Sequence, residues 1–133
     1  MSDELFLLGR VLFSLVFIRY GVLHLTKTAG SVQYAEYKKV PQPKAAVILS
    51  GLLMLLAGIA VVLGIWMDLA GICLAVFVLI AAFLFHRYWE EQDPQARAAE
   101  MAQFMKNVSL AGGALVIAAV ADGAPYTMTD GLF

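Results

Sequence analysis

The chain has 133 residues, of which 62% are hydrophobic and only 14% are charged, and its formal net charge at pH 7 is −1. Soluble domains contain about 45–50% apolar residues, because a small domain needs polar side chains to cover its surface. The composition therefore excludes a disordered chain and an ordinary soluble domain, and the near-zero net charge excludes nucleic acid as a partner. The remaining class is an integral membrane protein, and the length predicts a single domain over residues 1–133.

Four apolar segments are long enough to be membrane-spanning helices, because about 20 helical residues cross a hydrocarbon core of about 30 Å. The predicted spans are residues 5–25, 45–67, 69–89 and 101–121. Only a short break at Asp68 separates the second span from the third, so these two are expected to be antiparallel neighbours. The sequence thus predicts an all-α, four-helix transmembrane bundle.

The fourth span has only a short uncharged core, from Asn107 to Ala121. Asp93 and Pro94, which precede it, are typical of a helix N-cap followed by proline at the first helical position. We therefore expect this helix to begin near Pro94, to lie at the membrane interface at first, and to continue into the span.

Small residues recur along the spans, among them Gly71 in the third span and the run from Ala111 to Ala114 in the fourth. Membrane helices associate without a hydrophobic driving force, so close backbone approach at small residues provides the packing. This pattern predicts a compact bundle.

Lysine and arginine are distributed unevenly between the two sides of the predicted bundle. The loop after the first span and the region after the third contain seven of them: Lys27, Lys38, Lys39, Lys44, Arg87, Arg97 and Lys106. The two tails and the turn at Asp68 contain none. Because basic residues are retained on the cytoplasmic side, we expect both long loops inside the cell and both termini outside the cytoplasm.

Arg10 is an ionisable residue inside the first span. A guanidinium does not deprotonate in proteins, so within a membrane it needs a partner or access to water. Asp68 and Asp122 are expected at the same membrane level, and we predict a structural ion pair between Arg10 and one of them. Asp122 is favoured, because the turn at Asp68 is expected to stay solvated. The alternative is a buried cation that binds a quinone head group, a lipid phosphate or another anion.

A second polar group is expected at the opposite, cytoplasmic ends of the spans. His24 and His86 end two helices that run in the same direction, and Trp89 and Lys106 are expected near them. A titratable histidine beside an apolar slot suits a quinone or redox site, so these four residues are the candidate cofactor-binding residues. Haem ligation by the two histidines and a simple interfacial belt of polar and aromatic side chains are the alternatives.

The sequence contains no signature of self-contained catalysis. It has no Gly-rich phosphate loop, no zinc-ligand spacing and no Ser-His-Asp candidate, and no metal site is expected. Its single cysteine, Cys73, lies in an apolar span, so an internal disulfide is excluded. These features favour a non-catalytic or accessory subunit over an enzyme.

Four segments, taken in order, resemble the DoxX family of small four-helix membrane proteins. They are LLGRVLFSLVFIRYGVLHL from Leu7, YAEYKKVPQPKAAVILSGLLMLLAGIAVVLGI from Tyr34, FLFHRYW from Phe83 and FMKNVSLAGGALVIAA from Phe104. The resemblance covers about residues 7–121, and the positions that carry over are Arg10, Gly21, His86, Trp89, Lys106 and Asn107. Three positions depart from the family's usual pattern: His24 stands for a lysine, Met54 for a glutamate and Asp68 for a basic residue. Because Met54 stands where the family has a glutamate, this chain lacks a group that could handle protons in the second span. This weakens the case for independent catalysis.

The resemblance implies a protein of the bacterial cytoplasmic membrane that accompanies a redox system. Family members are similar to membrane components of thiosulfate:quinone oxidoreductases, or of oxidative-stress complexes with superoxide dismutase and a sulfurtransferase. We therefore expect an accessory or anchor subunit of a quinone-linked complex, with quinone as its cofactor and membrane lipids and other redox proteins as its partners. Two alternatives stay open: a structural scaffold with no chemistry of its own, and a membrane protein that binds a lipid or small molecule.

Overall fold

The computed structural model describes all 133 residues, and its regular secondary structure is helical, with no strand. The elements are α1 (Ser2–Thr26), α2 (Thr28–Tyr37), α3 (Pro43–Leu63), α4 (Met67–Phe85), the 3₁₀ helix η1 (Tyr88–Glu90) and α5 (Pro94–Ala119). Four segments are long and apolar enough to cross a membrane, namely α1, α3, α4 with η1, and α5. The predicted all-α fold with four membrane-spanning helices is therefore confirmed.

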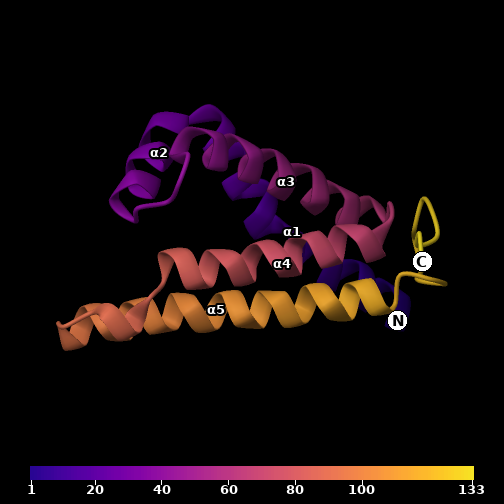
Figure 1. The fold of residues 1–133 in the computed structure, drawn as a ribbon. Coiled ribbons are helices and arrows are strands. Elements are labelled where there is room, and N and C mark those ends of the chain that lie inside the picture. Colours follow the sequence, from indigo (N-terminus) through magenta and orange to yellow (C-terminus); the bar gives the residue numbers. More distant parts are fainter.

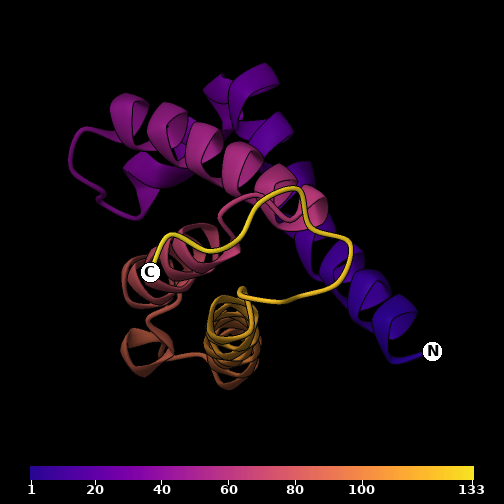
Figure 2. The same ribbon diagram turned by 90° about the vertical axis from the view of Figure 1, so that its right-hand side faces the viewer.

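The four long helices form two antiparallel pairs, α1 with α3 and α4 with α5. Figures 1 and 2 show that α3 and α4 meet at the turn between them and diverge toward their other ends. Both termini lie beside this turn, at what we call the Asp68 end, whereas α2 and η1 lie at the opposite, His86 end. Because α1 and α5 scarcely touch, the bundle is less evenly closed than the small residues predict.

Small residues bring the backbones of each pair close together. A Cβ atom on Gly21 of α1 would lie 2.7 Å from the backbone nitrogen of Leu55 in α3. A Cβ atom on Gly71 of α4 would lie 2.6 Å from the carbonyl oxygen of Ala114 in α5. Only glycine permits this approach, so the expected close packing occurs within the pairs.

The helix ends differ from the predicted spans at the Asp68 end. Helix α3 stops at Leu63, because Gly64 adopts a left-handed conformation with φ 68° that ends the helix. Helix α4 begins at Met67, so Asp68 lies in its first turn and not in an isolated loop. At the start of α5, the Asp93 carboxylate accepts a hydrogen bond of 2.8 Å from the backbone N–H of Ala96, and Pro94 follows as predicted.

Two further differences concern the His86 end. The third span was expected to reach residue 89, but α4 ends at Phe85 and η1 follows after a short break. Residues 26–44 were expected to be a loop, yet they contain the ten-residue helix α2. Ala35 of α2 is buried and packs with Val40 and Val47, so this helix covers the beginning of α3.

The segment after α5 folds back across the Asp68 end of the bundle, as Figure 2 shows for the yellow chain. The backbone N–H groups of Met128 and Thr129 donate to the Gly64 carbonyl, at 3.0 and 3.1 Å. The hydroxyl of Thr129 accepts a hydrogen bond of 2.9 Å from the Trp66 N–H. The C-terminal segment thus satisfies backbone groups that the α3–α4 turn leaves free.

Candidate functional site

A cavity of about 1040 Å³ lies between the two helix pairs. Its lining comes from all five α-helices, and two thirds of it, 20 of 30 residues, is hydrophobic. Phe17, Met54 and Phe77 line its middle, on α1, α3 and α4. Ligand pockets have volumes of about 300–1000 Å³, so the cavity has room for a molecule with a long apolar body.

The polar lining residues gather toward the His86 end of the cavity. They are His24, Lys27, Ser31, Ser50, His86, Glu100, Gln103, Lys106 and Asn107. The hydroxyl of Tyr34, whose ring counts among the hydrophobic residues, lies at the same end. They come from the last turn of α1, from α2, from the beginning of α3, and from the facing ends of α4 and α5. The cavity is therefore amphipathic, with an apolar body and a polar end.

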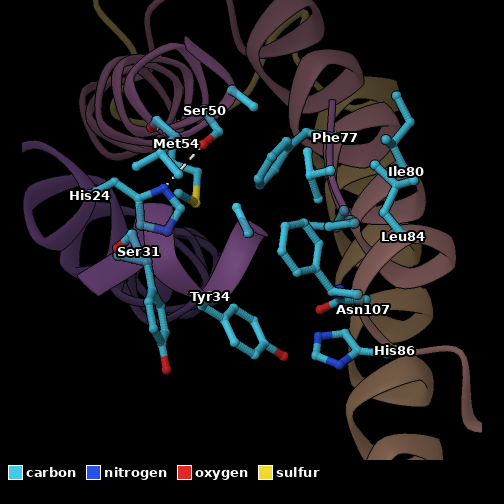
Figure 3. Close-up of a pocket in the computed structure, with 18 of the residues that line it drawn as sticks. His24, Ser31, Tyr34, Ser50, Met54, Phe77, Ile80, Leu84, His86 and Asn107 are labelled. Atoms are coloured by element: carbon cyan, nitrogen blue, oxygen red, sulfur yellow. Dashed lines mark hydrogen bonds between the residues drawn. The ribbon is translucent and has the colours of Figure 1, made fainter. Parts of the chain in front are cut away.

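His24 belongs to the α1–α3 wall of the cavity. Its Nδ1 atom lies 3.0 Å from the Ser50 hydroxyl, and this hydroxyl donates a hydrogen bond of 3.0 Å to the Val47 carbonyl. Figure 3 shows the imidazole extending from α1 into the space between the walls. Ser50 thus fixes the orientation of the His24 ring.

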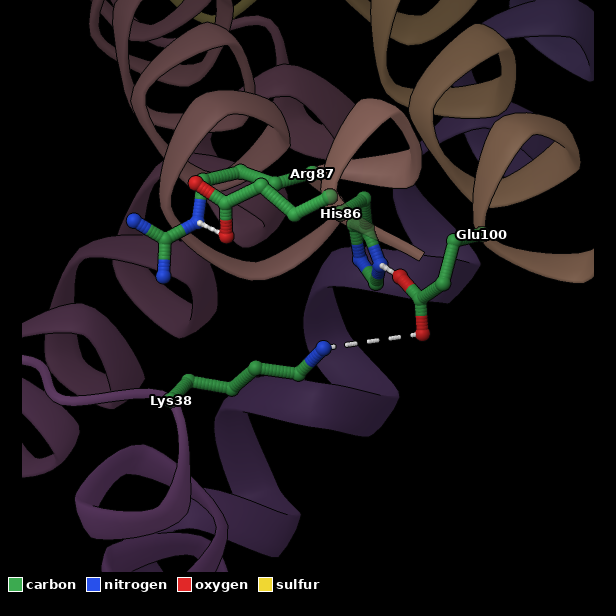
Figure 4. A network of polar contacts seen from close by, with 5 residues as sticks. Lys38, His86, Arg87 and Glu100 are labelled. Atoms are coloured by element: carbon green, nitrogen blue, oxygen red, sulfur yellow. Dashed lines mark hydrogen bonds and ion pairs between the residues drawn. The ribbon is translucent and has the colours of Figure 1, made fainter. Parts of the chain in front are cut away.

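His86 belongs to the opposite wall and takes part in a polar network that joins three elements (Figure 4). Its Nδ1 atom lies 2.9 Å from Oε2 of Glu100 in α5. The other carboxylate oxygen, Oε1, lies 3.6 Å from Nζ of Lys38, which follows α2. Lys38 and Glu100 therefore connect the two halves of the protein across the polar end of the cavity.

Tyr34 of α2 lies between the same two halves. Its ring stacks on the Phe85 ring with the centroids 5.6 Å apart. Burial raises the pKa of the Tyr34 hydroxyl, and the nearby negative charge of Glu100 raises it further. The phenol therefore stays protonated at neutral pH and can donate a hydrogen bond.

Asn107 of α5 presents its amide to the cavity without a partner in the protein. It is only 7% exposed and lines the cavity, and its side chain forms no hydrogen bond within the protein. Figure 3 shows it beside His86, on the wall that faces His24. The fully buried side-chain polar atoms that lack a partner are Nε of Arg10 and Oγ of Ser14. The Asn107 amide is therefore accessible from the cavity and can form hydrogen bonds with a molecule bound there.

The structure brings together three of the four candidate residues. His24, His86 and Lys106 line the cavity, with the two histidines on opposite walls, and Lys106 donates a hydrogen bond of 2.6 Å to Gln103. Trp89 does not line the cavity. It packs against the rings of its neighbours Phe83, Tyr88 and Phe104.

Tyr34, Ser50 and Glu100 also line the polar end, and Lys38 pairs with Glu100 beside it. None of these four residues was among the candidates. On α5 a signal existed, because Glu100, Gln103 and Asn107 recur at helical spacing and therefore share one face. For α2 there was none, because its apolar positions are few and their burial depends on α3.

Arg10 lies at the Asp68 end, outside the cavity lining, and does not form the predicted ion pair with Asp122 or Asp68. The guanidinium is 1% exposed. Its Nη2 donates to the carbonyl oxygen of Tyr126 at 2.7 Å, and Nη1 lies 3.4 Å from the Met67 sulfur. The partner of Arg10 is therefore a backbone carbonyl of the C-terminal segment.

Both aspartates bind the same segment. Asp68 accepts hydrogen bonds from the backbone N–H groups of Leu69, Leu132 and Phe133, and Asp122 accepts one from Gly131. Asp68 is only 3% exposed, so the expectation of a solvated turn is wrong. Because backbone N–H groups satisfy both carboxylates, neither needs the guanidinium as a counter-ion.

Comparison with known proteins shows the family of this chain. The DoxX family model matches residues 5–87, which include both histidines of the cavity. The chain belongs to the DoxX family. The inner membrane protein YphA of Escherichia coli (strain K12) is 32% identical to this DoxX chain over 120 residues, or 90% of this chain and 85% of YphA.

A second DoxX relative, the inner membrane protein YqjF of the same organism, is 32% identical over 124 residues, or 93% of this chain and 89% of YqjF. No solved structure matches the chain at a significant level. The family and the four spans together establish an integral membrane protein. The resemblance inferred from the sequence is confirmed.

Proposed function

We propose that this DoxX-family protein is a quinone-binding accessory subunit of a redox complex in the bacterial inner membrane. The observation that carries the proposal is the amphipathic cavity with the unpartnered amide of Asn107 at its polar end. An isoprenoid quinone has an apolar tail and a ring with two oxygens, so the tail suits the apolar body and the ring suits the polar end.

The accessory role and the membrane location have separate support. The accessory role rests on the resemblance of family members to membrane components of quinone-linked systems, whose other subunits carry the redox chemistry. The location rests on YphA and YqjF, both of which are named inner membrane proteins. Protein partners of this chain are then other membrane or membrane-associated redox proteins.

Removing both cavity histidines should reduce bound quinone. We expect the His24→Ala, His86→Ala double variant to retain about a tenth of the quinone per protein, because two net hydrogen bonds to a ligand are together worth about 1–3 kcal/mol. The measurement is chromatography of quinone extracted from protein purified in a mild detergent.

Trp89→Phe is the control, since Trp89 lies outside the cavity, and its quinone content should match that of the original protein. Unchanged quinone in the folded double variant would contradict the proposal and favour the structural scaffold.

The topology proposed for the membrane places both termini outside the cytoplasm. The two regions rich in lysine and arginine, residues 26–44 and 87–106, lie at the His86 end, and the termini lie at the Asp68 end. We expect an alkaline phosphatase fusion at the C-terminus to be active and a green fluorescent protein fusion there to stay dark, because basic loops are retained inside. The reverse pair of results would invert the topology.

A further inference from the structure

We propose that the cavity selects the reduced hydroquinone form of its ligand over the oxidised quinone, because both of its histidines present an acceptor nitrogen. The inference rests on the proposed function and specifies the redox state of the bound head group. It follows from the hydrogen bonds that fix each imidazole.

The Ser50 hydroxyl determines the tautomer of His24. A hydroxyl has one hydrogen, and that of Ser50 is donated to the Val47 carbonyl at 3.0 Å. The same oxygen lies 3.0 Å from Nδ1 of His24 and can therefore only accept there. Nδ1 thus carries the proton, and Nε2 of the neutral ring keeps its lone pair.

Glu100 determines the tautomer of His86 in the same way. A carboxylate accepts hydrogen bonds, so Nδ1 of His86 donates to Oε2 at 2.9 Å and Nε2 is left as the acceptor. The other carboxylate oxygen, Oε1, lies 3.6 Å from Nζ of Lys38, so a cation on one side and His86 on the other hold Glu100 in place. Glu100 is therefore a positioning residue for His86.

The other polar residues discriminate less between the two forms. The amide of Asn107 and the hydroxyl of Tyr34 can each donate or accept a hydrogen bond, so they suit either redox state. Lys27 and Lys106 are exposed at the rim of the cavity, and Lys106 already donates to Gln103. The two histidines, which face each other from opposite walls, therefore decide the preference.

The two redox forms differ in what they offer to these nitrogens. A hydroquinone has two hydroxyl donors at opposite edges of its ring, matching two acceptors on opposite walls. A quinone has two carbonyl acceptors there, and a lone pair facing a lone pair forms no hydrogen bond. The oxidised form thus leaves polar groups unpaired in an apolar cavity, which weakens its binding.

The test compares binding of decylubiquinone and chemically reduced decylubiquinol to the full chain in lipid nanodiscs, by calorimetry without oxygen. We expect the reduced form to bind about tenfold more tightly, the difference expected for about one to two net hydrogen bonds. Equal or tighter binding of the oxidised form would overturn this inference and leave the proposed function standing. Failure of both forms to bind would overturn the proposed function as well.

Glu100→Gln tests the tautomer itself. A glutamine amide can donate to Nδ1 of His86, which then moves the ring proton to Nε2, so the preference should fall to about threefold or less as one of the two acceptors is lost. Glu90→Gln is the matched control, because Glu90 pairs with Arg87 outside the cavity, and it should keep the tenfold preference. A preference that persists in Glu100→Gln would overturn the assignment of His86.

Discussion

Leucine in place of Gly71 is expected to destabilise the protein by about 3 kcal/mol or more, the upper part of the range for overpacked interiors. A Cβ atom at this position would lie 2.6 Å from the carbonyl oxygen of Ala114 and 3.0 Å from the Cβ of Ala118. The nearest obstacle is backbone, which cannot rotate away as a side chain can. Helices α4 and α5 would have to separate, which would disturb the wall that contains His86 and Asn107.

Gly112→Leu provides the matched control for Gly71→Leu. Gly112 lies on α5 with no atom within 4 Å of an added Cβ, so leucine there should change stability by less than about 0.5 kcal/mol. The measurement is unfolding in mixed micelles with increasing denaturing detergent. Equal stability of the two variants would show that the close approach of α4 and α5 is not required.

The fold was predictable from the sequence because the membrane constrains it strongly. A segment inside the membrane must satisfy all of its backbone hydrogen bonds within itself, so it forms a helix. The length of each uncharged segment therefore shows whether it can span the membrane. Asp93 and Pro94 marked the start of α5 correctly, because a capping carboxylate acts within its own turn. Helix α2 was missed because its apolar positions are few and their burial depends on α3.

The site was predictable only in part. His24, His86 and Lys106 were identified as polar residues at one membrane side, and this required only the topology. The cavity depends on how far the helix pairs diverge, and no local pattern specifies that angle. Lys38 and Glu100 meet across the cavity from α2 and α5, so their pairing follows from the tertiary arrangement.

The partners of Arg10 illustrate the limit of reasoning from side-chain charges. Arg10, Asp68 and Asp122 were correctly expected at one end of the bundle, but they bind main-chain groups of residues 126–133. Any residue type supplies a backbone N–H or carbonyl, so the sequence contains no direct signal for these bonds. The same geometry determines what replacing Arg10 should do.

Glutamate in place of Arg10 is expected to cost about 3–5 kcal/mol, the range for an uncompensated buried charge. The new carboxylate would face the carbonyl oxygen of Tyr126, where two acceptors meet and no hydrogen bond forms. Arg10→Leu should cost less, about 2 kcal/mol, because it removes the charge-assisted hydrogen bond to Tyr126 and the weak one to the Met67 sulfur without adding a charge. Asp68 keeps its three backbone donors in both variants, which limits the loss for leucine.

Arg19→Leu is the control for Arg10, since Arg19 is exposed on the same helix and forms no hydrogen bond within the protein. It should leave stability within about 0.5 kcal/mol. Unfolding in denaturing detergent measures the cost, and amide hydrogen exchange of residues 126–133 reports the C-terminal segment separately. If Arg10 holds this segment through the Tyr126 carbonyl, exchange there should accelerate in Arg10→Leu and not in Arg19→Leu. Unchanged exchange in both would show that Asp68 and Asp122 hold the segment without the guanidinium.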